Sequence, residues 1–224
     1  MVLKDWPVAE RPREKLLQSG AQALSDAELV GLLLGTGIAE KTAVGMARDL
    51  LAEHGGIREV LALDARRFCA VVGLGKTKYA RLQAAAELAR RELAQTLART
   101  DVLASPTAAR RYVKARLRDR PYEVFACLFL DNRHRVIRFQ EVFRGTVHSA
   151  TVHPRELVRE ALMCNASAAI VVHNHPSGVA EPSRCDVDVT VRLKQALSLV
   201  DVRLLDHLVV GDAEIVSLSE RGYL

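Results

Sequence analysis

The sequence predicts an α/β protein in which an all-helical N-terminal half precedes a domain built around a central mixed sheet. Two observations support this division. Residues 1–98 contain apolar runs at helical spacing, separated by glycines, and no stretch in which apolar and polar residues alternate. Residues 102–224 contain short, almost fully apolar runs between amphipathic segments, a pattern typical of strands that helices cover. We therefore expect two domains, 1–98 and 102–224.

Composition excludes several classes of protein. Of the 224 residues, 49% are hydrophobic and 26% are charged, as in a folded globular chain. No apolar run approaches the roughly 18 residues of a membrane span, and no signal peptide is recognisable, so we expect a cytoplasmic protein without membrane contact. The four cysteines form no C-x-x-C pair, which argues against disulfides or a cysteine zinc site. A net charge of +5 is compatible with nucleic-acid binding but does not demonstrate it. The sequence leaves the oligomeric state open, and a homodimer is one possibility.

Each helix of the N-terminal half has its own start or stop signal. Ser25 and Asp26 precede an apolar run, and glycine pairs or triplets end the successive helical segments. The expected helices are 27–34, 42–51, 57–63, 67–72 and 76–97.

The C-terminal half mixes both element types. Ser105 and Pro106 form the expected N-cap and first position of a helix, and Ser183 caps a later one. The expected helices are 107–119, 154–164 and 184–199, and the expected strands are 123–130, 135–143, 167–172, 203–210 and 214–218.

The strongest chemical signal follows the third of these strands. His173 and His175 are two residues apart, so side chains that alternate along a strand place both imidazoles on one face. Asp186 falls in the first turn of the next helix, from which the loop can fold it back toward the histidines. Two imidazoles and one carboxylate leave the fourth tetrahedral position of Zn²⁺ to water, as in catalytic zinc sites.

Simpler interpretations of these residues remain. Ser183 and Asp186 have the S-x-x-D spacing of a capping box, in which both side chains bind backbone N–H groups. Other folds with His-x-His pairs fit less well. A cupin is all-β, which the expected helices oppose, and an amidohydrolase barrel needs about 250 residues.

The combined pattern H-x-H-x7-S-x2-D resembles the motif of JAMM (MPN+) metalloproteases, which include zinc-dependent isopeptidases. The chain as a whole resembles the bacterial RadC family, named as DNA repair proteins. The resemblance rests on 173–178 (HNHPSG) and 182–186 (PSRCD), and on 11–16 (RPREKL), 144–146 (RGT), 153–156 (HPRE) and 206–211 (DHLVVG).

This resemblance implies an MPN/JAMM fold for the second domain and a zinc-dependent metallopeptidase acting on a peptide or protein. His173, His175 and Asp186 would hold the zinc, and Ser183 would donate its hydroxyl to the oxyanion. A glutamate near the site would move the proton from water to the leaving amine.

Glu123, at the start of the first strand, is the expected general base, and Glu141 on the partner strand is the rival. The alternative is that either glutamate only pairs with an arginine at the surface. His207 is a candidate partner for the second nitrogen of a metal-bound imidazole, or else a satisfied core residue. Cys185 adjoins a ligand, and its place in the helix is expected to turn it away from the metal.

A second motif lies in the N-terminal half. Residues 72–80 resemble a helix-hairpin-helix, in which Gly73 and Gly75 let backbone N–H groups approach a DNA phosphate. Lys76, Lys78 and Arg81 would add attraction that is independent of DNA sequence. The alternative is a turn that only joins two helices. A P-loop is excluded because Ala70 stands where the motif needs glycine and no strand precedes it.

A further basic cluster marks the helix that opens the second domain, and it is either a solvated face or a contact surface for DNA or an acidic partner. Its members are Arg110, Arg111, Lys114, Arg116, Arg118 and Arg120. Two functions from different classes therefore remain. One is a zinc metallopeptidase or isopeptidase, and the other is a DNA-binding repair or recombination accessory protein whose zinc site is not catalytic.

Overall fold

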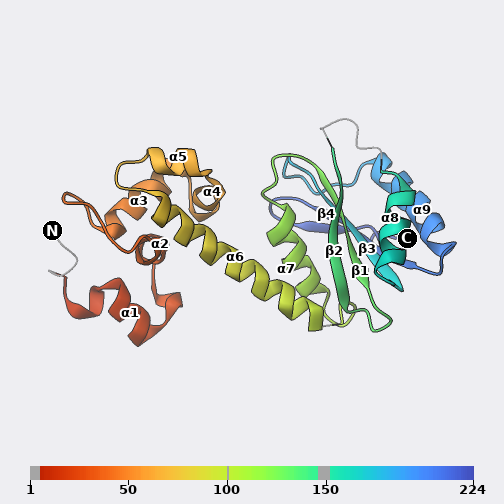
Figure 1. The fold of residues 1–224 in the computed structure, drawn as a ribbon, viewed down its shortest axis with the longest axis horizontal. Coiled ribbons are helices and arrows are strands. Elements are labelled where there is room, and N and C mark those ends of the chain that lie inside the picture. The colour runs from red at the N-terminus through yellow and green to blue at the C-terminus, as the bar shows by residue number, and fades with distance from the viewer. Residues whose placement is uncertain (1–5, 100, 146–151) are drawn as a thin grey trace. The chain divides into compact units, whose positions relative to one another are not determined.

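The computed structural model describes residues 6–99, 101–145 and 152–224 (Figure 1). The chain forms two compact units, residues 1–89 and 90–224. Their boundary lies within one long helix, whereas the sequence pattern placed it at the end of that helix, near residues 98–102. Helical periodicity continues through this stretch, so the sequence alone offers no break at residue 89.

The first unit is a cluster of short helices followed by the start of a long one. The α-helices are α1 (Pro12–Ser19), α2 (Asp26–Leu34), α3 (Ala43–His54), α4 (Ile57–Ala62), α5 (Ala65–Ala70) and α6 (Lys76–Arg99), with short 3-10 turns at Val8–Glu10 and Ala21–Ala23. Helix starts follow the expected capping chemistry. Ser25 and Glu28 form a capping box at α2, and the Thr42 hydroxyl accepts from the N–H of Gly45 at α3.

Two features of this unit were not predicted. Helix α1 was not recognised, because its apolar residues are few and its start is marked only by Pro12. Between α2 and α3, Ile38 and Lys41 form an isolated antiparallel β-bridge, so the unit is not purely helical. The core includes Leu34, Ala47 and Phe68, which are fully buried.

The second unit contains one five-stranded mixed sheet in the order β2-β1-β3-β4-β5. Its strands are β1 (Val124–Leu130), β2 (Val136–Arg144), β3 (Ala168–Asn174), β4 (Arg203–Val210) and β5 (Ile215–Ser217), and its further helices are α7 (Pro106–Leu117), α8 (Pro154–Met163) and α9 (Arg184–Ser198). Strand β1 pairs antiparallel with β2 and β3, whereas β3 and β4 are parallel and are joined through α9. The mixed α/β class that the sequence predicts is therefore the observed one.

Helices cover both faces of this sheet (Figure 1). Leu128 and its alternate neighbours on β1 pack with α7, whereas Phe125, Cys127 and Phe129 pack with α8 and α9. All of β1 and β3 is buried, as their nearly unbroken apolar sequences predict. Ala169, Val171 and His173 alternate onto the α9 face of β3, and this places His173 within reach of the first turn of α9.

One capping prediction was wrong. Helix α7 begins at Pro106 as expected, but the Ser105 side chain makes no capping hydrogen bond. The backbone N–H of Ser105 instead donates to the Asp101 carbonyl, 3.1 Å away, so a local turn precedes the helix. Within the described ranges, no helix is both long enough and apolar enough to cross a lipid bilayer.

Candidate metal centre

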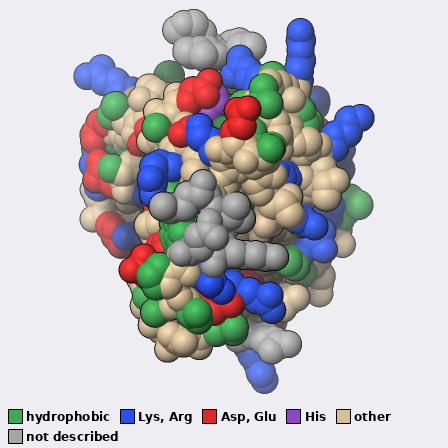
Figure 2. Space-filling view, turned by 90° about the vertical axis from the view of Figure 1, so that its left-hand side faces the viewer, with side chains coloured by type: hydrophobic (Ala, Val, Ile, Leu, Met, Phe, Trp, Pro, Cys, Tyr) green, Lys and Arg blue, Asp and Glu red, His purple; other side chains and the backbone are tan. Residues whose placement is uncertain are grey.

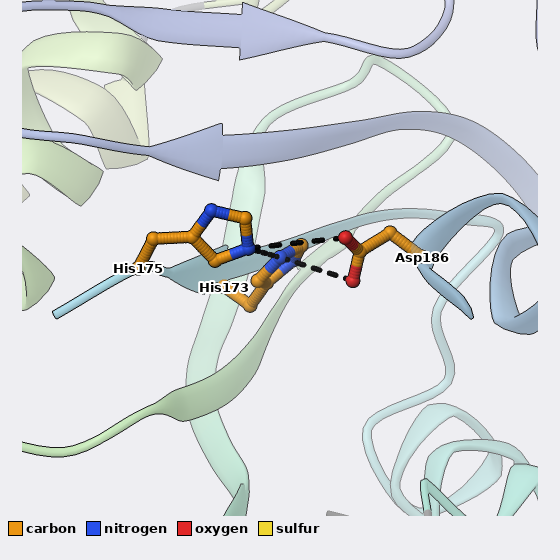
Figure 3. A group of neighbouring side chains, drawn as sticks. All are labelled: His173, His175 and Asp186. Atoms are coloured by element: carbon orange, nitrogen blue, oxygen red, sulfur yellow. Dashed lines mark hydrogen bonds and ion pairs between the residues drawn. The ribbon is translucent and has the colours of Figure 1, made fainter. Parts of the chain in front are cut away.

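His173, His175 and Asp186 converge on one point at the carboxyl end of β3 (Figure 3). His173 is the penultimate residue of β3, His175 follows that strand directly, and Asp186 is the third residue of α9. One ligand atom from each lies within 4.8 Å of the others. The sequence prediction thus placed together three residues that the fold does bring together.

Their separations suit one tetrahedral ion. The Nε2 atoms of the two histidines are 3.0 Å apart, and Asp186 Oδ1 lies 3.2 Å from His173 Nε2. Asp186 Oδ2 lies 3.8 Å from His175 Nε2. Zinc ligands at about 2.0–2.1 Å in tetrahedral geometry stand about 3.4 Å from one another, so the donor set has the dimensions of such a site.

The protonation of the two imidazoles also suits a cation. His175 Nδ1 donates to the Val179 carbonyl at 2.8 Å, so in a neutral ring its Nε2 carries no proton. Burial lowers the pKa of His173 to about 4, with the Asp186 carboxylate opposing the shift and His175 adding to it, so this ring is neutral at pH 7. Its Nδ1 contacts His207, and its Nε2 faces His175. In the tautomers with unprotonated Nε2 atoms, both rings offer a lone pair to a cation beside the Asp186 carboxylate.

The structure confirms the capping-box interpretation of Ser183 and Asp186. Asp186 Oδ2 accepts from the Ser183 N–H and hydroxyl, each at 2.6 Å, while the Asp186 N–H donates back to the Ser183 hydroxyl. The cap uses Oδ2 and leaves Oδ1 directed at His173. The two interpretations therefore do not compete, because the cap orients the carboxylate that faces the histidines.

Glu123 lies beside this cluster, whereas Glu141 is paired with arginines. Glu123 directly precedes β1, in which Phe125 pairs with His173. Burial raises the pKa of Glu123, with His175 opposing the shift and Asp186 adding to it, so both ligands act on its charge. Glu141 instead binds two guanidiniums, those of Arg120 at 2.7 Å and Arg144 at 3.1 Å.

Asn174 fixes the backbone around Glu123, and sequence reasoning missed it. The Asn174 side chain is fully buried. Its Oδ1 accepts from the Val124 N–H at 2.8 Å, and its Nδ2 donates to the Tyr122 carbonyl at 3.1 Å. These two groups flank Glu123 on either side. A buried polar residue at the end of an apolar strand was the available sequence signal.

His207 of β4 lies behind His173, in contact with the second nitrogen of that imidazole. Its Nε2 is 2.8 Å from His173 Nδ1. Thr190 of α9, also missed, contacts the other ring nitrogen of His207 at 2.5 Å. Cys185 is exposed, and it is not among the clustered ligands found in the described ranges.

The basic cluster on and after α7 is largely used within its own unit. Arg110 pairs with Glu220, Lys114 donates to the Ala213 carbonyl, and Arg116 lies over the Phe139 ring. Arg118 and Arg120 pair with Asp119 and Glu141. Five of the six residues of the cluster therefore have partners within their own unit.

The turn at residues 73–75 joins α5 to α6 as a helix-hairpin-helix requires. Gly73 has a φ of 81°, which favours glycine, and a side chain at Gly75 would meet no atom within 4 Å. Lys78, however, donates to the Gly73 carbonyl at 2.8 Å. Residues 1–89 hold twelve basic and eleven acidic side chains, and on the face in Figure 2 the two signs are interspersed.

Comparison with known proteins identifies relatives along the whole chain. Residues 103–223 match the family model described as RadC-like JAB domain, and residues 3–80 match the one described as UPF0758 N-terminal. Proteins named only UPF0758 protein align over the full length of both chains. That of Nitrosococcus oceani is 59% identical, that of Thioalkalivibrio sulfidiphilus 61% and that of Azotobacter vinelandii 56%.

Proposed function

Because the chain belongs to the RadC-like JAB domain family, with a UPF0758 N-terminal region, we propose that it is a zinc-dependent hydrolase of peptide or isopeptide bonds. The observation that carries this proposal is the donor set of His173, His175 and Asp186, in which the Nε2 atoms of both imidazoles face the Asp186 carboxylate. Three protein ligands leave a coordination position open, which is the mark of a catalytic site. The side chain of His175 is 21% exposed, so a substrate can approach from its side.

The residues of the chain have distinct roles in this proposal. His173, His175 and Asp186 hold the ion, which supplies Lewis-acid chemistry by activating a water near pH 7 and polarising the substrate carbonyl. The Glu123 carboxylate accepts the proton of the attacking water and delivers it to the leaving amine. Its raised pKa makes the carboxylate a better acceptor of the water proton, and its position beside His175 and Asp186 supports it over Glu141.

Ser183 has two tasks in turn. In the resting structure its hydroxyl donates to Asp186 Oδ2, so it orients a metal ligand. To stabilise the oxyanion, the hydroxyl rotates away from Asp186 toward the substrate oxygen, while the Ser183 N–H keeps hold of the carboxylate.

The test pairs elemental analysis with a peptide-library cleavage assay. The purified protein is expected to hold one zinc per chain and to cleave at least one peptide in a chelator-sensitive way. Glu123→Gln should keep the zinc and lose cleavage, because an amide cannot accept the proton. Glu141→Gln is the matched control and should keep both. A zinc-free protein after metal-supplemented expression, or an active Glu123→Gln variant, would refute the proposal.

A second candidate function is DNA binding through residues 73–81. It is favoured by the open surface at Gly75, where backbone N–H groups at the start of α6 can meet a phosphate. Since Lys78 already binds the Gly73 carbonyl, Lys76 is the better placed cation. The full chain should bind duplex DNA weakly, with a log–log salt slope of about −0.9 per phosphate, and Lys76→Glu should reduce binding. Unchanged binding by that variant would place the DNA site elsewhere, and no binding at low salt would exclude it.

A further inference from the structure

A chain of buried hydrogen bonds runs behind the metal centre. His173 Nδ1 lies 2.8 Å from His207 Nε2, and His207 Nδ1 lies 2.5 Å from the Thr190 hydroxyl. That hydroxyl donates to the backbone carbonyl of Asp186, also at 2.5 Å. This series of hydrogen bonds therefore begins at one candidate ligand, His173, and ends at another, Asp186. All three of its side chains, those of His173, His207 and Thr190, are fully buried.

The elements of the fold explain how the four residues meet. Thr190 lies one helical turn after Asp186 on α9, so its hydroxyl reaches the carbonyl four residues back. His207 lies on β4, which is the parallel neighbour of β3. Its ring projects under α9 on the same face of the sheet as His173, against the Phe125 ring. All three side chains are fully buried, so bulk solvent does not compete for these hydrogen bonds.

The direction of every bond follows from the carbonyl at the end. The Asp186 carbonyl can only accept, so the single proton of the Thr190 hydroxyl points toward it. The hydroxyl oxygen must then accept from His207, which places the proton of that ring on Nδ1. A neutral imidazole carries a single proton, so Nε2 of His207 is then unprotonated.

The same reasoning continues to the ligand. With its proton on Nδ1, His207 presents a bare Nε2 that accepts from His173 Nδ1. His173 then has no proton on Nε2, the atom that faces His175 and Asp186. The Thr190 hydroxyl thus selects, through His207, the tautomer of His173 that a metal ligand needs.

We propose that Thr190 is a positioning residue of the metal centre, which acts through His207 to hold His173 in the tautomer with an unprotonated Nε2. This inference rests on the proposed metal site and adds a residue to it. Without the hydroxyl, His207 gains by moving its proton to Nε2. His173 must then move its own proton from Nδ1 to Nε2, where it blocks coordination.

The test compares Thr190→Val, which keeps the shape and removes the hydroxyl, with Thr190→Ser, which restores the hydroxyl. Long-range ¹H–¹⁵N NMR of the metal-free full chain reports which nitrogen of each ring is protonated. We expect Nδ1–H rings for His173 and His207 in the wild type and the Ser variant, and Nε2–H rings in the Val variant. His175, held by the Val179 carbonyl, should keep its tautomer throughout.

Zinc competition against a chelator gives the second readout. Thr190→Val should bind zinc about 10–100-fold more weakly, as is typical when a partner of a metal-bound imidazole is lost, and Thr190→Ser should bind as the wild type does. Ser217→Ala is the matched control, because it removes another buried hydroxyl, which donates to Asp206 at 2.7 Å outside the chain of bonds. It should change neither the tautomers nor the affinity.

The two readouts separate this inference from the proposed function. Retention of the wild-type tautomers by Thr190→Val overturns the inference, as does zinc affinity within about twofold of wild type. A wild-type protein that binds no zinc refutes the proposed function, whereas the NMR result still decides whether Thr190 sets the tautomer of His173.

Discussion

Acid should destabilise the metal-free protein through the buried histidine of the site. Burial lowers the pKa of His173 from 6.5 to about 4, so between these values the unfolded chain binds a proton that the folded chain does not. Above pH 6.5 His173 is neutral in both states, and the folded chain keeps its full stability. As the pH falls toward 4, protonation of His173 in the unfolded chain lowers the free energy of unfolding. At about 1.4 kcal/mol per pH unit, the free energy of unfolding should fall by about 3 kcal/mol between pH 7 and pH 4.

Urea unfolding of the chelator-treated full chain, followed by circular dichroism, measures this loss. His207 should add to it in the same direction, since its pKa is also lowered by burial. A loss of about 3 kcal/mol is a large fraction of the 5–15 kcal/mol that stabilises a typical domain. His173→Gln removes the titrating group and should flatten the dependence by about that amount. If wild type and His173→Gln lose stability in parallel, the buried histidine does not cause the acid sensitivity.

Three further predictions follow from the geometry of the site. Asn174→Ala leaves the backbone groups on either side of Glu123 without partners, so urea unfolding should show a loss of about 2–4 kcal/mol, and a loss below about 1 kcal/mol would contradict this account. Gly178→Ala should lower the free energy of unfolding by about 1–2 kcal/mol, because φ is 83° there and the added Cβ would lie 2.9 Å from Asp212; an unchanged melting temperature would refute the strain. Zinc at about 100 times its dissociation constant should raise the free energy of unfolding of the metal-free protein by about 2.7 kcal/mol, and no shift in the urea midpoint would mean that the folded state does not bind it preferentially.

The sequence determined the elements of the fold more fully than their boundaries. Apolar runs without alternation predicted the buried strands β1 and β3, and Ser25 and Ser183 marked helix starts that the structure has. These signals are local, because capping and strand burial depend on neighbouring residues and on composition. Helix α1 was missed because only Pro12 marks its start, and the residues before α7 were misread because the Ser105 side chain makes no capping hydrogen bond.

For the site, the sequence determined the metal-ligand candidates and the tertiary structure decided what surrounds them. The spacing of His173 and His175 at the end of one strand, with Asp186 at a helix start, is a local pattern. It can be recognised in the sequence before the fold is known. The choice of Glu123 over Glu141 depends on which carboxylate two arginines occupy, and therefore on how β1 and β2 pair. Thr190 and His207 meet only because α9 packs over the parallel pair of β3 and β4. Hydrogen bonds between residues distant in sequence carry no periodicity, so only the folded chain shows them.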